Sequence, residues 1–239
     1  MRAGAGWVRA AVPASLNPIF EVKLTEVMSV PLADEDGHLL VRAADEVLEA
    51  SERADSVVLG PGLGRTPESF ELAQLLLARI ERPMLVDADG LNALAEAGLE
   101  TAGRRQAATV LTPHAGELAR LLGTSSGEVS AHRLASVREA AERSGAVVVL
   151  KGDDTLIAEA GRLAISKGGS PALATAGTGD VLSGVVGAFL ARGVAAFEAA
   201  CAAVMVHADA GRRAAERLGT DSVMAGDVID ALPSAFRGA

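Results

Sequence analysis

The sequence predicts an α/β protein in which a mostly parallel sheet lies between two layers of helices, a three-layer αβα sandwich. Short apolar runs of strand length alternate with longer segments of helical spacing, the pattern of repeated strand–helix–strand units. Hydrophobic residues make up 49% of the 239 residues and aromatic residues only 3%, so we expect a core of Ala, Val, Leu and Ile. This length and composition predict one domain over residues 1–239.

The expected elements follow from these runs in chain order. Apolar stretches of three or four residues predict buried strands over 56–59, 84–86, 109–111, 147–150 and 156–158. Apolar residues at steps of three and four, or long Ala-rich stretches, predict helices over 68–80, 130–144, 181–192 and 195–218. We expect Gly127 and Gly145 to lie in turns between them.

Charge and hydropathy exclude several classes of protein. The net charge is −9 and the basic residues are scattered, so no nucleic-acid partner is expected. No apolar segment reaches eighteen residues and no leader peptide is visible, which predicts a cytoplasmic protein without a membrane span. The single Cys201 cannot form an internal disulfide, and we expect it to be a small buried hydrophobe.

Polar or glycine-rich segments follow four of the predicted strands. In an open parallel sheet, ligands bind outside the carboxyl ends of the strands, so these four loops are candidates for one site. They read LGPGLGR (59–65), DADGLN (87–92), TPHAGE (112–117) and KGDDT (151–155).

The first two loops have structural interpretations of equal or greater weight. The glycines of 60–64 fit neither a Walker loop nor a dinucleotide fingerprint, and they can form a tight turn as readily as a ligand contact. Asp87, Asp89 and Asn92 could bind a cation or a hydroxyl. Alternatively, Asp89 or Asn92 begins a helix and Gly90 forms the turn before it.

The other two loops carry His114 and Lys151. An exposed imidazole at His114 could contact a ligand, whereas Thr112 and Glu117 can be read as helix-start groups. Lys151 follows a buried strand at a place suited to a nucleotide. The residues of 151–155 are also typical of a solvated hairpin turn between two strands. The remaining histidines, at positions 38, 132 and 207, are expected on loop or helix surfaces.

The segment ATAGTGDVLSG (174–184) predicts a helix that starts near Thr178 or Gly179. Its first N–H groups would lack partners and its dipole is positive there, so Gly177, Thr178 and Gly179 form a candidate anion hole. Asp180 is either a complement to the helix dipole or a base beside a bound phosphate. Glycine is unfavourable in helices, and that cost favours the ligand-binding interpretation.

Together these motifs resemble the ribokinase-like superfamily and, more closely, the ADP/ATP-dependent (S)-NAD(P)H-hydrate dehydratase family. The matching segments are GPGLGR (60–65), VDADGLNAL (86–94), LTPHAGELARLLG (111–123), LKGDDTLIA (150–158) and ATAGTGDVLSG (174–184). The segment TEVMSVPL (25–32) resembles a further family motif more weakly. Five motifs in family order are far more specific than any one of them.

The resemblance implies a ribokinase-like fold and the repair of NADH or NADPH that has gained water across the C5–C6 bond of the nicotinamide. In this family ADP phosphorylates the resulting hydroxyl, AMP is released and phosphate is then expelled. The resemblance implies Asp180 as catalytic base and contacts to the hydrated coenzyme from Gly64, His114 and Asp180. It implies contacts to the AMP moiety from Lys151, Gly152, Asp153, Asp154, Thr155 and Gly179.

Physical chemistry agrees with this assignment, because phosphoryl transfer depends mainly on positioning and charge neutralisation. The helix dipole should keep Asp180 ionised and hence a weak base in the ground state. Magnesium is expected with the nucleotide, although no metal cage is visible and the metal ligands are unknown; Mg²⁺ often uses phosphates and waters.

The resemblance also has an expected departure and expected partners. The family begins with a further strand and a GGS-type loop, and both are expected to be missing before MRAGAGWV (1–8), with an exposed sheet edge as a result. The family implies a homo-oligomer, typically a tetramer, and coupling to an NAD(P)H-hydrate epimerase. The alternatives are a small-alcohol kinase of the same superfamily and a nucleotide-binding remnant without activity.

Overall fold

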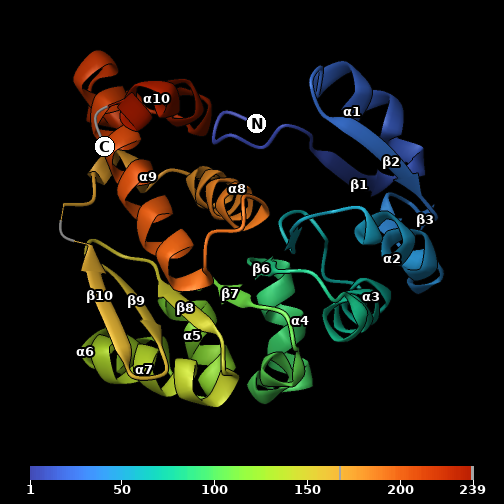
Figure 1. Cartoon of the computed structure of the whole chain (residues 1–239), viewed down its shortest axis with the longest axis horizontal. Coiled ribbons are helices and arrows are strands. Elements are labelled where there is room, and N and C mark those ends of the chain that lie inside the picture. The colour runs from blue at the N-terminus through green and yellow to red at the C-terminus, as the bar shows by residue number, and fades with distance from the viewer. Residues whose placement is uncertain (167, 238–239) are drawn as a thin grey trace.

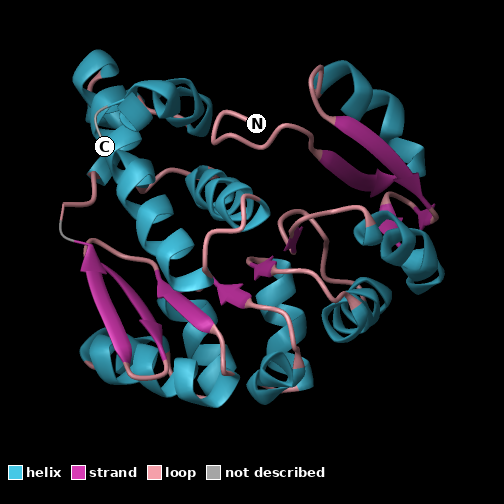
Figure 2. Cartoon of the chain, viewed as in Figure 1, coloured by secondary structure: helices cyan, strands magenta, loops and turns pink. Residues whose placement is uncertain are grey.

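A six-stranded sheet forms the centre of the protein, for which the computed structural model describes residues 1–166 and 168–237 (Figures 1 and 2). Its strand order is β10-β9-β8-β7-β6-β5. Strands β5 to β8 are parallel to one another, and β9 pairs antiparallel with both of its neighbours, β8 and β10. The strands are β5 (Val57–Leu59), β6 (Met84–Val86), β7 (Thr109–Leu111), β8 (Val147–Leu150), β9 (Thr155–Glu159) and β10 (Arg162–Ser166). This confirms the predicted mostly parallel sheet.

Helices cover both faces of the sheet, because successive strand residues point to opposite sides. In β6, Met84 and Val86 join one hydrophobic core and Leu85 joins the other. The first core also receives α2 (Ala44–Glu52), α3 (Pro67–Arg79), α4 (Asp89–Ala97), α5 (Ala115–Leu122), α6 (Ser126–Ala131) and α7 (Arg133–Ser144). The second receives α8 (Thr178–Ala191), α9 (Ala196–Leu218) and α10 (Ala225–Arg237). Three layers result, as predicted.

Local signals explain where several helices begin and end. Thr66 caps α3 by accepting a hydrogen bond from the Ser69 N–H, and Gly145 ends α7 in the left-handed conformation. The single helix predicted over 130–144 is wrong, because the chain leaves helical geometry at His132 and forms α6 and α7. Gly127 lies inside α6 and not in a turn.

The amino-terminal region adds two small sheets that the sequence analysis did not predict. Strand β1 (Arg9–Pro13) pairs in parallel with β2 (Met28–Leu32), and α1 (Asn17–Lys23) connects them in the chain. This pair lies apart from the six-stranded sheet (Figure 1). Strands β3 (Asp34–Glu35) and β4 (His38–Leu39) form a short hairpin. Most residues of β1 and β2 are partly exposed, so their apolar periodicity is weak. Strand β5 is the last strand of the six-stranded sheet, and Val58 is 40% exposed there.

Two further predictions concern single features of the chain. Cys201 is only half-buried and not fully buried, although burial still raises the pKa of its thiol. Among the described residues, no helix is both long enough and apolar enough to span a bilayer.

Candidate active site

The loops at the carboxyl ends of β5 and β6 are packed backbone against backbone. Gly60 has a φ of 125°, and a Cβ placed on it would lie 1.9 Å from the Asp87 carbonyl oxygen. A Cβ on Gly90 would lie 2.7 Å from the Leu59 carbonyl oxygen. No side chain fits at either position, so these two glycines are required by the close approach of the two loops themselves.

Gly64 ends the first of these loops with its N–H already satisfied. The Gly64 N–H donates to Asp89 Oδ2 at 3.1 Å, and Arg65 Nε donates to Asp89 Oδ1 at 2.8 Å. Asp89 is the first residue of α4 and fixes this loop; no side chain caps the helix, and Gly90 lies inside α4 and not in a turn before it. Gly64 is partly buried and has a φ of 88°, where a side chain would be strained, and a Cβ placed on it would lie 3.4 Å from His38 Nδ1.

A buried carboxylate at the end of β6 organises the centre of the site. Asp87 is 1% exposed; its Oδ1 lies 2.9 Å from Lys151 Nζ and its Oδ2 accepts a hydrogen bond from Ser183 Oγ at 2.7 Å. Because Lys151 follows β8 and Ser183 belongs to α8, the triad joins three elements distant in sequence. A Cβ on Gly179 would lie 3.7 Å from Lys151 Nζ, so the ammonium group lies beside the start of α8.

His114 caps α5, as part of a reciprocal capping box. Its Nδ1 accepts from the N–H groups of Gly116 and Glu117, while Glu117 Oε2 accepts from the His114 N–H at 2.9 Å. The acceptor role of Nδ1 places the proton of the neutral ring on Nε2. The side chain is 56% exposed, so a ligand can reach the ring, although Nε2 lies 3.5 Å from Glu117 Oε1. Glu117, 3.8 Å from Lys151 Nζ, is confirmed as a helix-start group.

The start of α8 leaves backbone donors exposed. Gly177 precedes the helix with a φ of 86°, and no side chain caps the helix. The Thr178 N–H donates to the Thr175 carbonyl at 3.3 Å, so it turns back into the chain instead of serving an anion. The Gly179 and Asp180 N–H groups donate to no protein acceptor in the described residues. The Gly177 N–H likewise has no protein acceptor among the described residues, so two of the three residues of the predicted anion hole keep a free N–H group and the Asp180 N–H adds a third.

Asp180 is exposed in the first turn of α8. Partial burial and the neighbouring Asp87 carboxylate raise the pKa of Asp180 above its ordinary value, while Lys151 acts in the opposite direction. This direction is opposite to the one that the helix dipole alone would give. Desolvation and a like charge outweigh the stabilising groups and make Asp180 a stronger proton acceptor than an ordinary aspartate.

His207 is buried and not on the helix surface, so this expectation from the sequence is also wrong. Its Nε2 lies 2.9 Å from the Thr178 carbonyl oxygen, and burial lowers the pKa of the imidazole to about 4. The neutral ring therefore donates its Nε2–H to this carbonyl near neutral pH. The Thr178 hydroxyl donates to the Leu173 and Thr175 carbonyls, so the first turn of α8 is held from both sides.

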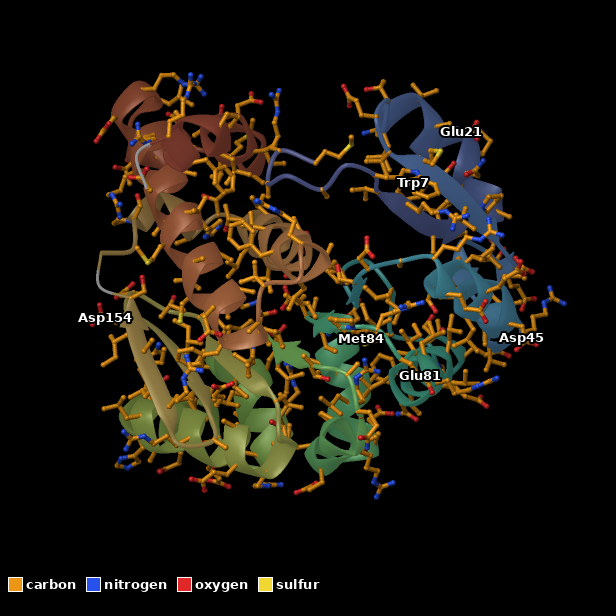
Figure 3. All side chains as sticks on the ribbon, viewed as in Figure 1. Trp7, Glu21, Asp45, Glu81, Met84 and Asp154 are labelled. Atoms are coloured by element: carbon orange, nitrogen blue, oxygen red, sulfur yellow. The ribbon has the colours of Figure 1, made fainter. Side chains whose placement is uncertain are left out.

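The segment 151–155 is a turn between the antiparallel strands β8 and β9, as its composition predicted. Gly152, Asp153 and Asp154 are exposed, and Asp154 lies at the periphery of the molecule (Figure 3). The Lys151 N–H donates to the Pro113 carbonyl at 2.9 Å, which joins this turn to the loop that carries His114. The turn thus lies at the same edge of the sheet as the other loops.

Arg133 braces this turn from the start of α7, which the sequence analysis did not detect. Its Nη2 donates to the Asp154 carbonyl at 2.8 Å. A Cβ on Gly152 would lie 2.6 Å from the same nitrogen. The guanidinium group therefore occupies the space that a side chain at Gly152 would need.

No group of three or more His, Cys, Asp or Glu side chains that could hold a metal ion is found among residues 1–166 and 168–237. Asp87 and Glu117 lie 2.9 and 3.8 Å from Lys151 Nζ, and both are buried with their oxygens already engaged by protein groups. The described residues therefore fit an Mg²⁺ ion that would be held by substrate phosphates and water.

Comparison with known proteins gives consistent results. A family model described as NAD(P)H-hydrate dehydratase matches residues 1–234. The ADP-dependent (S)-NAD(P)H-hydrate dehydratase of Xanthomonas campestris is 34% identical over 98% of this chain and 79% of its own length. The crystal structure of the Bacillus subtilis ADP/ATP-dependent NAD(P)H-hydrate dehydratase, co-crystallised with ATP and Mg²⁺, superposes with a TM-score of 0.82 at 25% identity, covering all of this chain and 81% of that one.

Longer relatives are also similar. The bifunctional NAD(P)H-hydrate repair enzyme Nnr of Moorella thermoacetica is 41% identical over 99% of this chain. The chain spans 45% of that protein, less than half its length. These matches confirm the ribokinase-like fold expected from the motifs, and the chain belongs to the NAD(P)H-hydrate dehydratase family.

Proposed function

We propose that this protein catalyses the ADP-dependent dehydration of (S)-NAD(P)H hydrate and returns the coenzyme to NADH or NADPH. The observation that carries the proposal is the arrangement of charge at the start of α8. There Lys151, held by the buried Asp87, lies beside Gly179 and near a carboxylate of raised pKa, Asp180. A cation and free N–H groups beside a base are what phosphoryl transfer to a hydroxyl requires.

The reaction proceeds in two steps. Asp180 accepts the proton of the ring hydroxyl as the hydroxyl oxygen forms a bond to the β-phosphorus of ADP, and AMP leaves with the electron pair of the broken P–O bond. Phosphate then departs with the electron pair of the ring C–O bond, and the neighbouring ring carbon loses a proton. The C5–C6 double bond is thereby restored. The Gly179 and Asp180 N–H groups and Lys151 stabilise charge on the transferring phosphoryl group.

The remaining residues divide between the two substrates. The turn formed by Lys151, Gly152, Asp153, Asp154 and Thr155, together with Gly179, binds the AMP moiety. Gly64 and His114 contact the hydrated nicotinamide. The hydrogen bond from the Gly64 N–H to Asp89 supports this, because it fixes the loop that carries Gly64.

The named relatives support the choice of co-substrate and metal. The Xanthomonas campestris protein is named as ADP-dependent, and the Bacillus subtilis protein was co-crystallised with ATP and Mg²⁺. When bound, Mg²⁺ would neutralise charge on the phosphates and would be held mainly by phosphate oxygens and water.

The proposal extends to the cellular setting. The bifunctional repair enzymes support functional coupling to an NAD(P)H-hydrate epimerase. We place the protein in the cytoplasm, as one ribokinase-like domain over residues 1–239 that assembles into a homo-oligomer.

The test is to incubate the protein with hydrated NADPH or NADH, ADP and Mg²⁺, and to follow absorbance at 340 nm with the amount of AMP. We expect the absorbance of the reduced nicotinamide to return, with one AMP formed per coenzyme restored. ATP consumption with a small alcohol and no return of absorbance would instead show a kinase. ADP binding without either reaction would show an inactive remnant. Both of these results contradict the proposal.

A further inference from the structure

An open hollow of about 380 Å³ lies beside the proposed coenzyme contacts, and no role has yet been given to it. It is lined by residues of α3, α4 and α5, the helices that follow β5, β6 and β7, and by Arg65. Arg65 directly follows Gly64, so the hollow adjoins the loop that carries this proposed coenzyme contact. The lining residues are Arg65, Phe70, Asn92, Ala95, Glu96 and Arg120.

Two guanidinium groups face this hollow. Arg65 shares its charge with Asp89, but its side chain is 69% exposed. Arg120 donates through Nη1 to Asn92 Oδ1 at 3.0 Å and forms no ion pair with any carboxylate in the described part of the chain. Glu96 is the acidic residue of the lining. Arg120 is therefore the guanidinium group of the hollow that has a neutral hydrogen-bond partner and no direct ion pair in the described part of the chain.

The hollow is connected to the coenzyme contact through one short chain of hydrogen bonds. Asp89 accepts from the Gly64 N–H and from Arg65 Nε, and Asn92 donates to the same carboxylate at 3.3 Å. Arg120 is held by Asn92 in turn. A ligand that touches Gly64 can therefore extend along this chain into the hollow without leaving the surface of the protein.

We propose that this hollow binds the 2′-phosphorylated adenosine half of the coenzyme, so that the protein selects the hydrate of NADPH over that of NADH. The inference rests on the proposed function. A phosphate monoester dianion matches the planar fork of an unpaired arginine, which can donate two parallel hydrogen bonds. Phe70 and Ala95 supply apolar surface for a base, and the open rim admits the end of a long dinucleotide.

The first experiment measures steady-state kinetics of R120Q with both hydrates. We expect KM for the NADPH hydrate to rise about tenfold, since one charge-assisted phosphate contact is lost. KM for the NADH hydrate, KM for ADP and kcat should each stay within about twofold of wild type. No change with either hydrate would overturn the proposal. An equal loss with both would assign Arg120 to the pyrophosphate and overturn the assignment to the 2′-phosphate.

Two more variants test the sign and place of the charge. E96Q removes the acidic residue of the lining and should lower KM for the NADPH hydrate by about twofold, the opposite direction to R120Q. R138Q removes an exposed arginine of α7, outside the hollow, and should change neither KM. A rise of KM in E96Q, or an effect of R138Q equal to that of R120Q, would contradict the assignment.

A binding measurement separates this inference from the proposed reaction. Adenosine 2′,5′-bisphosphate is titrated calorimetrically into wild type and R120Q, with ADP present at saturation. We expect binding about tenfold weaker in R120Q, and no such difference when AMP is titrated. If R120Q binds adenosine 2′,5′-bisphosphate more weakly but the wild-type protein does not restore absorbance at 340 nm, the proposed reaction is wrong and the proposed phosphate site is retained. If recovery occurs but R120Q binds as wild type does, the phosphate site is wrong.

Discussion

The two ends of the candidate site differ in how far the protein has satisfied its own polar groups. At the phosphate end, the start of α8 exposes two unpartnered N–H groups beside Lys151, whose position is fixed by a carboxylate buried to 1% exposure. At the coenzyme end, the Gly64 N–H is bonded to Asp89 and the Nδ1 of His114 caps α5. The phosphate end offers a ligand a positive charge and free N–H donors. At the coenzyme end, these polar groups are already bonded within the protein.

This difference shows which part of recognition is built into the fold. A phosphoryl group needs strong, prearranged electrostatics, and buried supports such as Asp87 and His207 provide them. At the coenzyme end, an aspartate and a histidine, Asp89 and His114, mainly hold their own loops together. Selectivity there must come from outward side chains such as the His114 Nε2 edge and Arg120.

The largest expected effect comes from breaking the buried support of the phosphate end. D87A leaves Lys151 with only Glu117, 3.8 Å away, and loss of one member of a buried pair costs roughly 3–5 kcal/mol. Lys151 is 23% exposed, so water compensates in part and we expect about 2 kcal/mol. Turnover should fall at least about a hundredfold because the cation is misplaced. Urea unfolding and steady-state rates measure the two effects.

The control is D45N on α2, where Asp45 is 91% exposed and lies 3.7 Å from Arg79. It should change the free energy of unfolding by less than about 0.5 kcal/mol. Equal effects of D87A and D45N would remove the distinction between the buried and exposed carboxylates.

The second effect concerns His207 and acid stability. Its pKa is about 4 in the folded protein and near 6.5 when unfolded, so the unfolded chain binds more protons between these values. Stability should therefore fall as pH falls from 6.5 towards 4, with a slope approaching about 1.4 kcal/mol per pH unit from this residue. Urea unfolding over this range should show a shallower dependence in H207Q. H132Q, at an exposed histidine, should retain the wild-type slope, and a slope unchanged in H207Q would contradict the account.

The third effect tests the turn that binds AMP. G152A puts a methyl group 2.6 Å from Arg133 Nη2, so we expect KM for ADP to rise about tenfold with kcat little changed. The same substitution in an R133A background should have a smaller effect, because the obstacle is gone. G184A, where a Cβ has no neighbour within 4 Å, is the matched control. Additive effects in the double variant would argue against steric coupling.

The smallest effect separates the two roles of His114. H114N keeps a side-chain acceptor for the capping box, so stability should change by less than about 0.5 kcal/mol, whereas H114A should cost about 1 kcal/mol. Both variants lose the Nε2 edge and should raise KM for the hydrated coenzyme severalfold without changing KM for ADP. If H114N keeps the wild-type KM, the histidine serves only as a cap.

The layered fold could be predicted because local pattern and buried contacts agree in most elements. The strands at Met84–Val86, Thr109–Leu111 and Val147–Leu150 lie where short apolar runs predicted them. The amino-terminal sheets were missed because β1 and β2 are partly exposed and lack a clear period. The break between α6 and α7 at His132 was missed because no Pro or Gly stands there to indicate a helix end in the sequence.

The candidate site was predictable only where chemistry follows a strand end in sequence. Lys151, His114 and Asp180 lie in such loops, and the structure brings their loops to one edge of the sheet. Asp87 was noted as a strand-end carboxylate, but its partners lie 64 and 96 residues away. His207 and Arg133 act across helices, so no local pattern distinguished them from surface residues. The raised pKa of Asp180 likewise depends on a neighbour supplied by the fold.

The most direct test titrates ADP calorimetrically into D180N and K151M and measures their turnover with the hydrated coenzyme. If the phosphate end works as described, D180N binds ADP within about twofold of wild type and loses turnover by about a thousandfold, as expected for loss of a general base. K151M should bind ADP at least about tenfold more weakly, since a charge-assisted contact is lost. Turnover retained in D180N, or ADP affinity lost equally in both variants, would contradict the account.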